Sequence, residues 1–99
     1  MILNMGKLRL AVIGVGHLGS IHAKIYKENP NCELIGVCDS NLERLNQVRT
    51  TLETKGYTDY QELFGKIDAV SIAVPTVLHH KIAAQFLESG IHALVEKPF

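Results

Sequence analysis

The 99-residue sequence contains no tryptophan, only two cysteines and three prolines, and no apolar run long enough to cross a membrane. Ten basic side chains balance ten acidic ones, so no net field attracts a nucleic acid or an anionic membrane surface. Residues 1–6 lack the basic and apolar regions of a signal peptide. Cys32 and Cys38 fit neither a disulfide staple nor a CxxC metal clip, which predicts a reduced, cytoplasmic setting.

The composition that remains is that of an ordinary globular domain. Apolar residues make up 46% and charged residues 20%, and no segment is of low complexity. A chain of this length forms one domain at most and buries about two-thirds of the surface exposed on unfolding. No two histidines have metal-ligand spacing on one helix face, so no metal site is predicted. The histidines are His17, His22, His79, His80 and His92.

Short apolar runs predict parallel strands that are covered on both faces. The strongest of them, residues 67–74, is ended by Pro75, because proline cannot donate a hydrogen bond to a central ladder. The predicted strands cover residues 8–13, 32–38, 57–58, 67–74 and 91–95.

Apolar residues at helical spacing predict helices between these strands. In the first helix, Leu18, Ile21, Ile25 and Tyr26 mark the face expected to pack on the sheet. The helices begin at Leu18, at Leu42 and after a cap at Thr76; their ends are expected at Pro30, Gly56 and Gly90, with a single turn at 60–64.

Strands that alternate with helices through short connections predict right-handed crossovers and a doubly wound α/β fold. The expected order of its parallel strands is 3-2-1-4-5. Ligands of such sheets bind at the edge formed by the carboxyl ends of the strands, so the residues that follow each strand are the candidates for function.

The stretch GVGHLG fits a GxGxxG pattern at the junction of the first strand and first helix. Gly14 permits a tight turn, Gly16 lets the backbone approach a pyrophosphate, and Gly19 allows close helix packing. His17 and Leu18 occupy the variable positions, where the helix N-terminus offers free amides. The pattern predicts a dinucleotide site; the alternative is a glycine-rich turn that binds nothing.

Asp39 lies 20 positions after Gly19, at the end of the second strand. There a carboxylate can accept hydrogen bonds from both hydroxyls of an adenosine ribose, and the alternative role is a helix N-cap. The same charge repels a 2′-phosphate by about 4 kcal/mol at about 4 Å and an effective dielectric of about 20, so NAD is expected over NADP. Arg44, one turn into the next helix, weakens this expectation because it is within reach of a phosphate.

Val74, Pro75 and Thr76 end the fourth strand at the same edge and are expected to line the nicotinamide side. A strand stop followed by a helix cap explains them equally well. His79, one turn further, has access to this edge and is placed with the cofactor-facing residues, although a supporting or structural role is the stronger explanation.

Glu96 and Lys97 follow the fifth strand, again at the carboxyl edge. An ammonium group there would lie near the nicotinamide and a substrate hydroxyl, where a lysine can act as acid or base. A solvated surface lysine is the alternative, with equal weight from position alone.

Together these residues resemble the Gfo/Idh/MocA oxidoreductases over nearly the whole chain. The likeness rests on AVIGVGHLGSIHA in the phosphate loop, on ELIGVCDSN at the ribose site, on DAVSIAVPTVLHHKIAAQFLESGIHALVEKPF in the late strands, and above all on the closing EKP.

The resemblance implies a Rossmann domain and hydride transfer between NAD(P) and a sugar, cyclitol or related secondary alcohol. It matches Lys97 to the catalytic lysine of the EKP motif and Glu96 to a position that supports the nicotinamide end. The same comparison assigns cofactor contacts to Gly14, Gly16, Gly19, Asp39, Pro75 and Thr76.

Members of this family continue into a second α/β domain that supplies the substrate wall, whereas this sequence stops at Phe99. We therefore expect residues 1–99 to form a single NAD(P)-binding domain, incomplete at the C-terminal edge of its sheet and without the substrate domain. Such a piece is expected to self-associate or to belong to a longer enzyme, and to turn over little substrate alone. The alternative is a non-catalytic nucleotide-binding or interaction module; a methyltransferase ranks last, because its chemistry does not require EKP.

Overall fold

The computed structural model describes residues 7–74 and 76–95. Its strands are β1 (Leu8–Ile13), β2 (Cys32–Cys38), β3 (Lys55–Tyr57), β4 (Ala69–Ile72) and β5 (His92–Val95). Its helices are α1 (His17–Glu28), α2 (Leu42–Thr51) and α3 (Thr76–Glu88), with a 3-10 turn η1 (Tyr60–Leu63). The strands form one five-stranded sheet, and every neighbouring pair in it is parallel.

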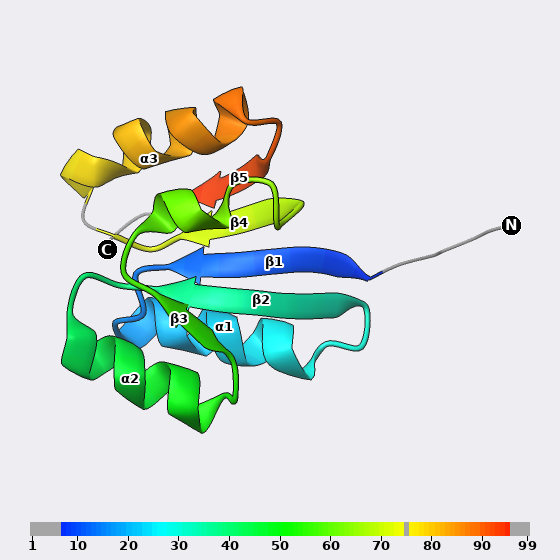
Figure 1. Ribbon diagram of the computed structural model, residues 1–99, viewed down its shortest axis with the longest axis vertical. Helices are drawn as coiled ribbons and strands as arrows, with labels where there is room; N and C mark the ends of the chain where they lie inside the picture. Colours follow the sequence, from blue (N-terminus) through cyan, green and yellow to red (C-terminus); the bar gives the residue numbers. More distant parts are fainter. Residues whose placement is uncertain (1–6, 75, 96–99) are drawn as a thin grey trace, which may run out of the picture.

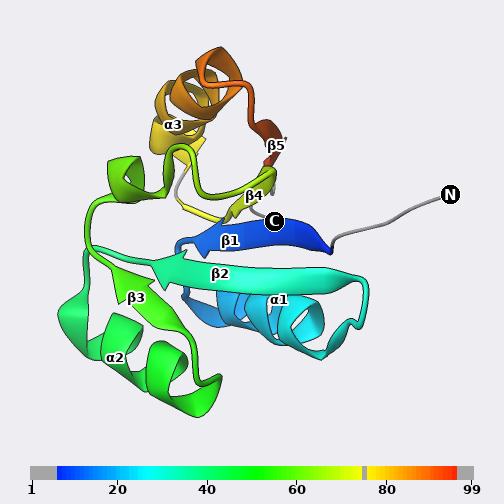
Figure 2. The same ribbon diagram turned by 45° about the vertical axis from the view of Figure 1, so that its right-hand side comes forward.

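The order β3-β2-β1-β4-β5 confirms the predicted doubly wound fold. Helices α1 and α2 cover one face of the sheet, and α3 with η1 covers the other (Figures 1 and 2). Because all strands run in the same direction, their carboxyl ends meet at one edge, where α1 and α3 begin (Figure 1).

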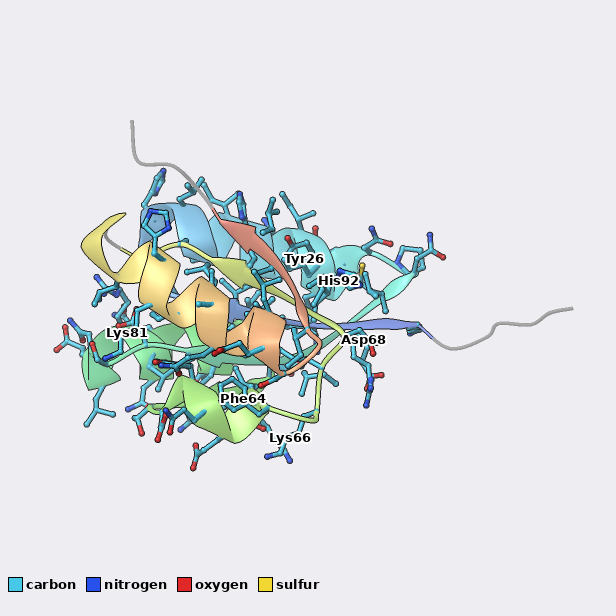
Figure 3. All side chains as sticks on the ribbon, turned by 90° about the horizontal axis from the view of Figure 1, so that it is seen from above. Tyr26, Phe64, Lys66, Asp68, Lys81 and His92 are labelled. Carbon is cyan, nitrogen blue, oxygen red and sulfur yellow. The ribbon has the colours of Figure 1, made fainter. Side chains whose placement is uncertain are left out.

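Each face of the sheet carries its own apolar core. Under α3 and η1 the largest fully buried side chains are Phe86 and Leu63. Phe64, labelled in Figure 3, meets Phe86 edge-on with ring centroids 4.9 Å apart. The second core, under α1 and α2, is formed by Val12, Val15, Ala23, Leu34, Val37 and Leu45. Two covered faces explain why the central strands are almost continuously apolar.

The register between β1 and β2 shifts once, so that Ile35 is skipped in the pairing. This irregularity reverses the alternation of side chains along β2, because Leu34 and Val37 then share the core under α1 and α2. Ile35 packs instead against the core under α3. Two residues beyond Val37, the side chain of Asp39 therefore lies on the α2 side of the sheet.

The prediction that Gly56 ends the second helix is wrong. Helix α2 ends at Thr51, and Gly56 is the middle residue of β3, which also begins earlier than expected. A Cβ at Gly56 would lie 2.7 Å from the Cδ of Arg49, so this glycine allows α2 to pack closely on β3. Its role is packing, which sequence alone does not distinguish from helix termination.

The predicted inner face of α1 is wrong for three of its four residues, and only Tyr26 packs against the core under α1 and α2. Leu18, Ile21 and Ile25 are 39%, 43% and 53% exposed, and the buried residues of the helix are Gly19 and Ala23. At Gly19 the helix lies so close to the Gly14 carbonyl that no side chain fits between them. Within the described residues no helix is long and apolar enough to span a membrane.

Candidate functional site

Gly14 lies at the carboxyl edge of the sheet, where the ends of β1, β2 and β4 come together. Its φ of 89° is in the region that favours glycine, and its N–H donates to the Cys38 carbonyl at 2.8 Å. A Cβ at this position would lie 2.5 Å from the Ala73 carbonyl oxygen and 2.9 Å from Val74. The tight turn predicted at Gly14 is therefore present, and both backbone and packing require a glycine there.

Gly19 and Gly16 are glycines for different reasons. A Cβ at Gly19 would overlap the Gly14 carbonyl oxygen, so Gly19 provides the close helix packing that the sequence predicts. Gly16 has an ordinary φ of −68°, and the nearest atom to a Cβ there would be Arg44 Nη1, at 3.8 Å. Neither conformation nor packing requires Gly16, so its bare backbone is free for a ligand to approach.

The N-terminus of α1 begins at this bare backbone. Gly16 is the N-cap and provides no side-chain hydrogen bond, and the first turn contains no acidic residue. His17 and Leu18 in that turn are exposed. The positive end of the helix dipole is thus not neutralised by the helix's own side chains, which makes it a place for an anion.

Asp39 follows β2 directly and its side chain is only 4% exposed. Its Oδ2 accepts the Val15 N–H at 2.9 Å, and its Oδ1 accepts the Asn41 N–H at 2.9 Å. Arg44 donates to both oxygens, from Nε to Oδ2 at 3.0 Å and from Nη2 to Oδ1 at 3.1 Å. The carboxylate therefore connects the glycine turn to the start of α2.

These contacts keep Asp39 charged. Burial alone would raise the pKa of Asp39, but hydrogen bonds from Arg44, Asn41 and Val15 outweigh it and hold the pKa below its ordinary value. The alternative role of Asp39 as the N-cap is wrong, because the cap of α2 is Asn41, whose side chain accepts the Arg44 N–H at 3.1 Å.

The structure brings most of the predicted residues to one edge. Val74 follows β4 beside Gly14, and the backbone of Thr76 begins α3 at the same edge. The side chains of Thr76 and His79 are not described. The remaining predicted residues, Pro75, Glu96 and Lys97, lie outside the described residues. Those that the structure places together are Gly14, Gly16, His17, Leu18, Gly19, Asp39 and Val74.

Sequence reasoning missed the backbone partners of this site. The Val15 amide and the Cys38 carbonyl act through the main chain, so no residue type reveals them. The pairing of Arg44 with Asp39 had a signal, namely opposite charges five positions apart where a strand ends and a helix begins. Among residues 7–74 and 76–95, no group of three or more histidine, cysteine or acidic side chains comes together to hold a metal ion.

A second arginine–aspartate pair lies away from the site. Arg9 donates from Nη2 to Oδ1 of Asp68 at 3.1 Å and from Nε to Oδ2 at 3.3 Å. Arg9 is near the start of β1 and Asp68 precedes β4, at the amino edge of the sheet (Figure 3). This pair has the same forked geometry without a neighbouring glycine turn.

A glycine turn, an uncapped helix N-terminus and a carboxylate at the end of β2 define a dinucleotide-binding Rossmann domain. A protein-family model that describes an oxidoreductase family with an NAD-binding Rossmann fold matches residues 8–99 of the chain. The chain thus belongs to the Gfo/Idh/MocA family, as its motifs predicted, and is the NAD-binding domain of that family.

Curated relatives and solved structures agree with this assignment. UDP-N-acetylglucosamine 3-dehydrogenase of Acidithiobacillus ferrooxidans is 41% identical over 92 residues, which are 93% of this chain and 29% of the relative. D-glucoside 3-dehydrogenase of Escherichia coli is 36% identical over 98 residues, covering 92% of this chain and 27% of that protein. GenD2 from gentamicin A biosynthesis, solved with NAD, superposes with a TM-score of 0.88 at 28% identity, over 99% of this chain and 30% of its own. The chain thus spans less than a third of each of these proteins.

Proposed function

We propose that this chain is the cofactor-binding domain of an enzyme that transfers hydride between NAD and a secondary alcohol of a sugar or cyclitol. The observation that carries the proposal is Gly16, a glycine that neither conformation nor packing requires, at an uncapped helix N-terminus. The dehydrogenases similar to this chain act, by their names, on a UDP-sugar and on glucosides, which supports the substrate class.

The residues present fit the cofactor. The amides of the first turn of α1, with Gly14 and Gly16, would hold the diphosphate, and Asp39 would hold the adenosine ribose. NAD, when bound, supplies the hydride acceptor. His17 and Leu18 would flank the diphosphate as the exposed residues of that turn.

The nicotinamide side belongs to the later strands in this proposal. Val74, Pro75, Thr76 and His79 would face the nicotinamide, because they follow β4 at the carboxyl edge. Lys97 would be the catalytic residue that exchanges a proton with the substrate hydroxyl, and Glu96 and Lys97 would both contact the nicotinamide end of the cofactor. These roles rest on the EKP motif.

We further propose that residues 1–99 are a single domain that binds NAD in preference to NADP and needs a substrate domain for turnover. Both thiols, Cys32 and Cys38, are free, in keeping with a reduced cytoplasmic setting.

The isolated chain is expected to self-associate, because Leu94 on the edge strand β5 is 54% exposed and apolar residues of α1 face outward. A monomer in light scattering would contradict the last expectation.

Calorimetric titration of the folded chain with NAD and NADP tests the cofactor site. We expect saturable binding of NAD and weaker binding of NADP, and no binding of either would refute the proposal. Hydride transfer is tested by exchanging this chain for the matching domain of the Acidithiobacillus dehydrogenase. NADH formation that Lys97→Met abolishes would support the proposal, whereas NAD binding without turnover in the chimera would favour the non-catalytic module.

A further inference from the structure

We propose that Arg44 occupies, in the free domain, the positions on Asp39 that the adenosine ribose takes, so that NAD binds only when the guanidinium moves away. The inference rests on the proposed cofactor site and concerns how that site is filled before the ligand arrives. It makes Arg44 a specificity-determining residue that competes with the cofactor from within the chain.

The first step is the hydrogen-bonding capacity of the carboxylate. An ionised carboxylate accepts about four hydrogen bonds through its two oxygens. Four N–H groups already donate to Asp39, one from Val15, one from Asn41 and two from Arg44. The side chain is 4% exposed, so there is no open side from which two further hydroxyls can reach it. A ribose therefore has to displace a donor.

Of these donors, only the Arg44 guanidinium can move away from Asp39 without disturbing the backbone. The Val15 N–H belongs to the backbone between β1 and α1, and the Asn41 N–H belongs to the residue that caps α2. Moving either would disrupt a turn or a cap. The Arg44 side chain is 48% exposed and lies on a helix surface, so its guanidinium can rotate into solvent without moving the backbone.

The guanidinium also has the right shape to stand in for a ribose. Its Nε–H and Nη2–H form a fork of two neighbouring donors, 3.0 Å and 3.1 Å from the two oxygens of Asp39. The adjacent 2′- and 3′-hydroxyls of a ribose present a comparable pair of donors. The fork and the diol thus compete for the same two oxygens.

The position of the guanidinium supports the same conclusion. A Cβ at Gly16 would lie 3.8 Å from Arg44 Nη1 and 4.0 Å from Cζ. The group that covers Asp39 therefore also borders the bare backbone proposed for the diphosphate. It thus contacts Asp39 and borders Gly16, the two places that one adenosine diphosphate would occupy together.

The test compares NAD with its analogue that lacks the 2′-hydroxyl of the adenosine ribose. The dissociation constant of the analogue divided by that of NAD measures what the 2′-hydroxyl contributes to binding. This ratio cancels any effect of Arg44 on the phosphates, because both compounds share them. We expect Arg44→Met to increase this ratio about threefold to tenfold, because Asp39 is then open to the ribose. Arg44→Lys keeps the charge but not the fork, so its ratio should lie between those of the unaltered chain and Arg44→Met.

Arg9→Met is the matched control, because it breaks a forked arginine–aspartate pair at the opposite edge and should leave the ratio unchanged. Thermal melts establish that each variant is folded. If NAD binds but the ratio stays the same or falls in both Arg44 variants, Arg44 does not compete with the ribose. If the folded chain and all variants bind neither compound, the proposed function itself is overturned.

Discussion

Replacing Gly16 by alanine is expected to weaken NAD binding while the stability of the domain hardly changes. A Cβ there meets no protein atom closer than 3.8 Å, so it introduces no clash in the free domain. Alanine is a poorer N-cap than glycine by about 0.5–1 kcal/mol. Alanine also restricts the unfolded chain more than glycine does, which stabilises the domain by about 0.4–1 kcal/mol. The net change in the free energy of unfolding is therefore close to zero.

The same methyl group lies where a diphosphate has to approach the backbone. Crowding of a packed contact costs about 1–3 kcal/mol, which corresponds to a dissociation constant about fivefold to 150-fold larger. Gly19→Ala, three residues along the same helix, is the comparison. There the Cβ would overlap the Gly14 carbonyl oxygen, so the backbone has to move and the free energy of unfolding should fall by about 2–3 kcal/mol or more.

Thermal unfolding and calorimetric titration of both variants check this contrast. Each kcal/mol lowers the melting temperature of a domain of this size by about 4–8 °C, so the loss in Gly19→Ala is easily measured. Unchanged NAD affinity in Gly16→Ala would refute the reasoning, because the bare backbone at Gly16 would then not seat the diphosphate. An equal loss of stability in both variants would show that Gly16 also has a packing role.

The remaining predictions concern the carboxylate, the thiols and the core. Because the pKa of Asp39 is lowered on folding, its stabilisation is present above about pH 4 and is lost as the pH falls further, so Asp39→Asn should flatten the acid limb of a pH–stability curve. Burial, with the charges of nearby carboxylates, raises the pKa of Cys38 to about 12, so a thiol reagent at mildly alkaline pH should label Cys32 first. Phe86→Ala should lower the free energy of unfolding by about 3–5 kcal/mol in urea titration.

The first two strands were the most predictable part of this fold, whereas β4 is shorter than the predicted 67–74 and ends before Pro75. Leu8–Ile13 and Cys32–Cys38 were predicted with the bounds that the structure has. Each is a buried apolar run that ends at a residue with a different task, Gly14 in one case and Asp39 in the other. The packing role of Gly56 against α2 was not predictable from its local sequence, because the reason lies in a neighbouring element.

The candidate site was predictable where side chains reveal it. The spacing of the glycines and the position of Asp39 follow from chain order, since a strand, a turn and a helix are consecutive. The state of Asp39 does not follow from chain order, because it depends on a register shift in β2 and on the rotamer of Arg44. Sequence thus located the carboxylate but not its hydrogen-bond partners.

The misjudged face of α1 and the candidate site have one physical cause. Periodicity selects large apolar residues as the inner face, yet apart from Tyr26 it is Gly19 and Ala23 through which α1 packs on the sheet. A larger residue at Gly19 would lift the helix from the Gly14 carbonyl and carry its N-terminal amides away from the ends of β1 and β2. The close approach that positions those amides for a diphosphate therefore turns Ile21 and Ile25 outward.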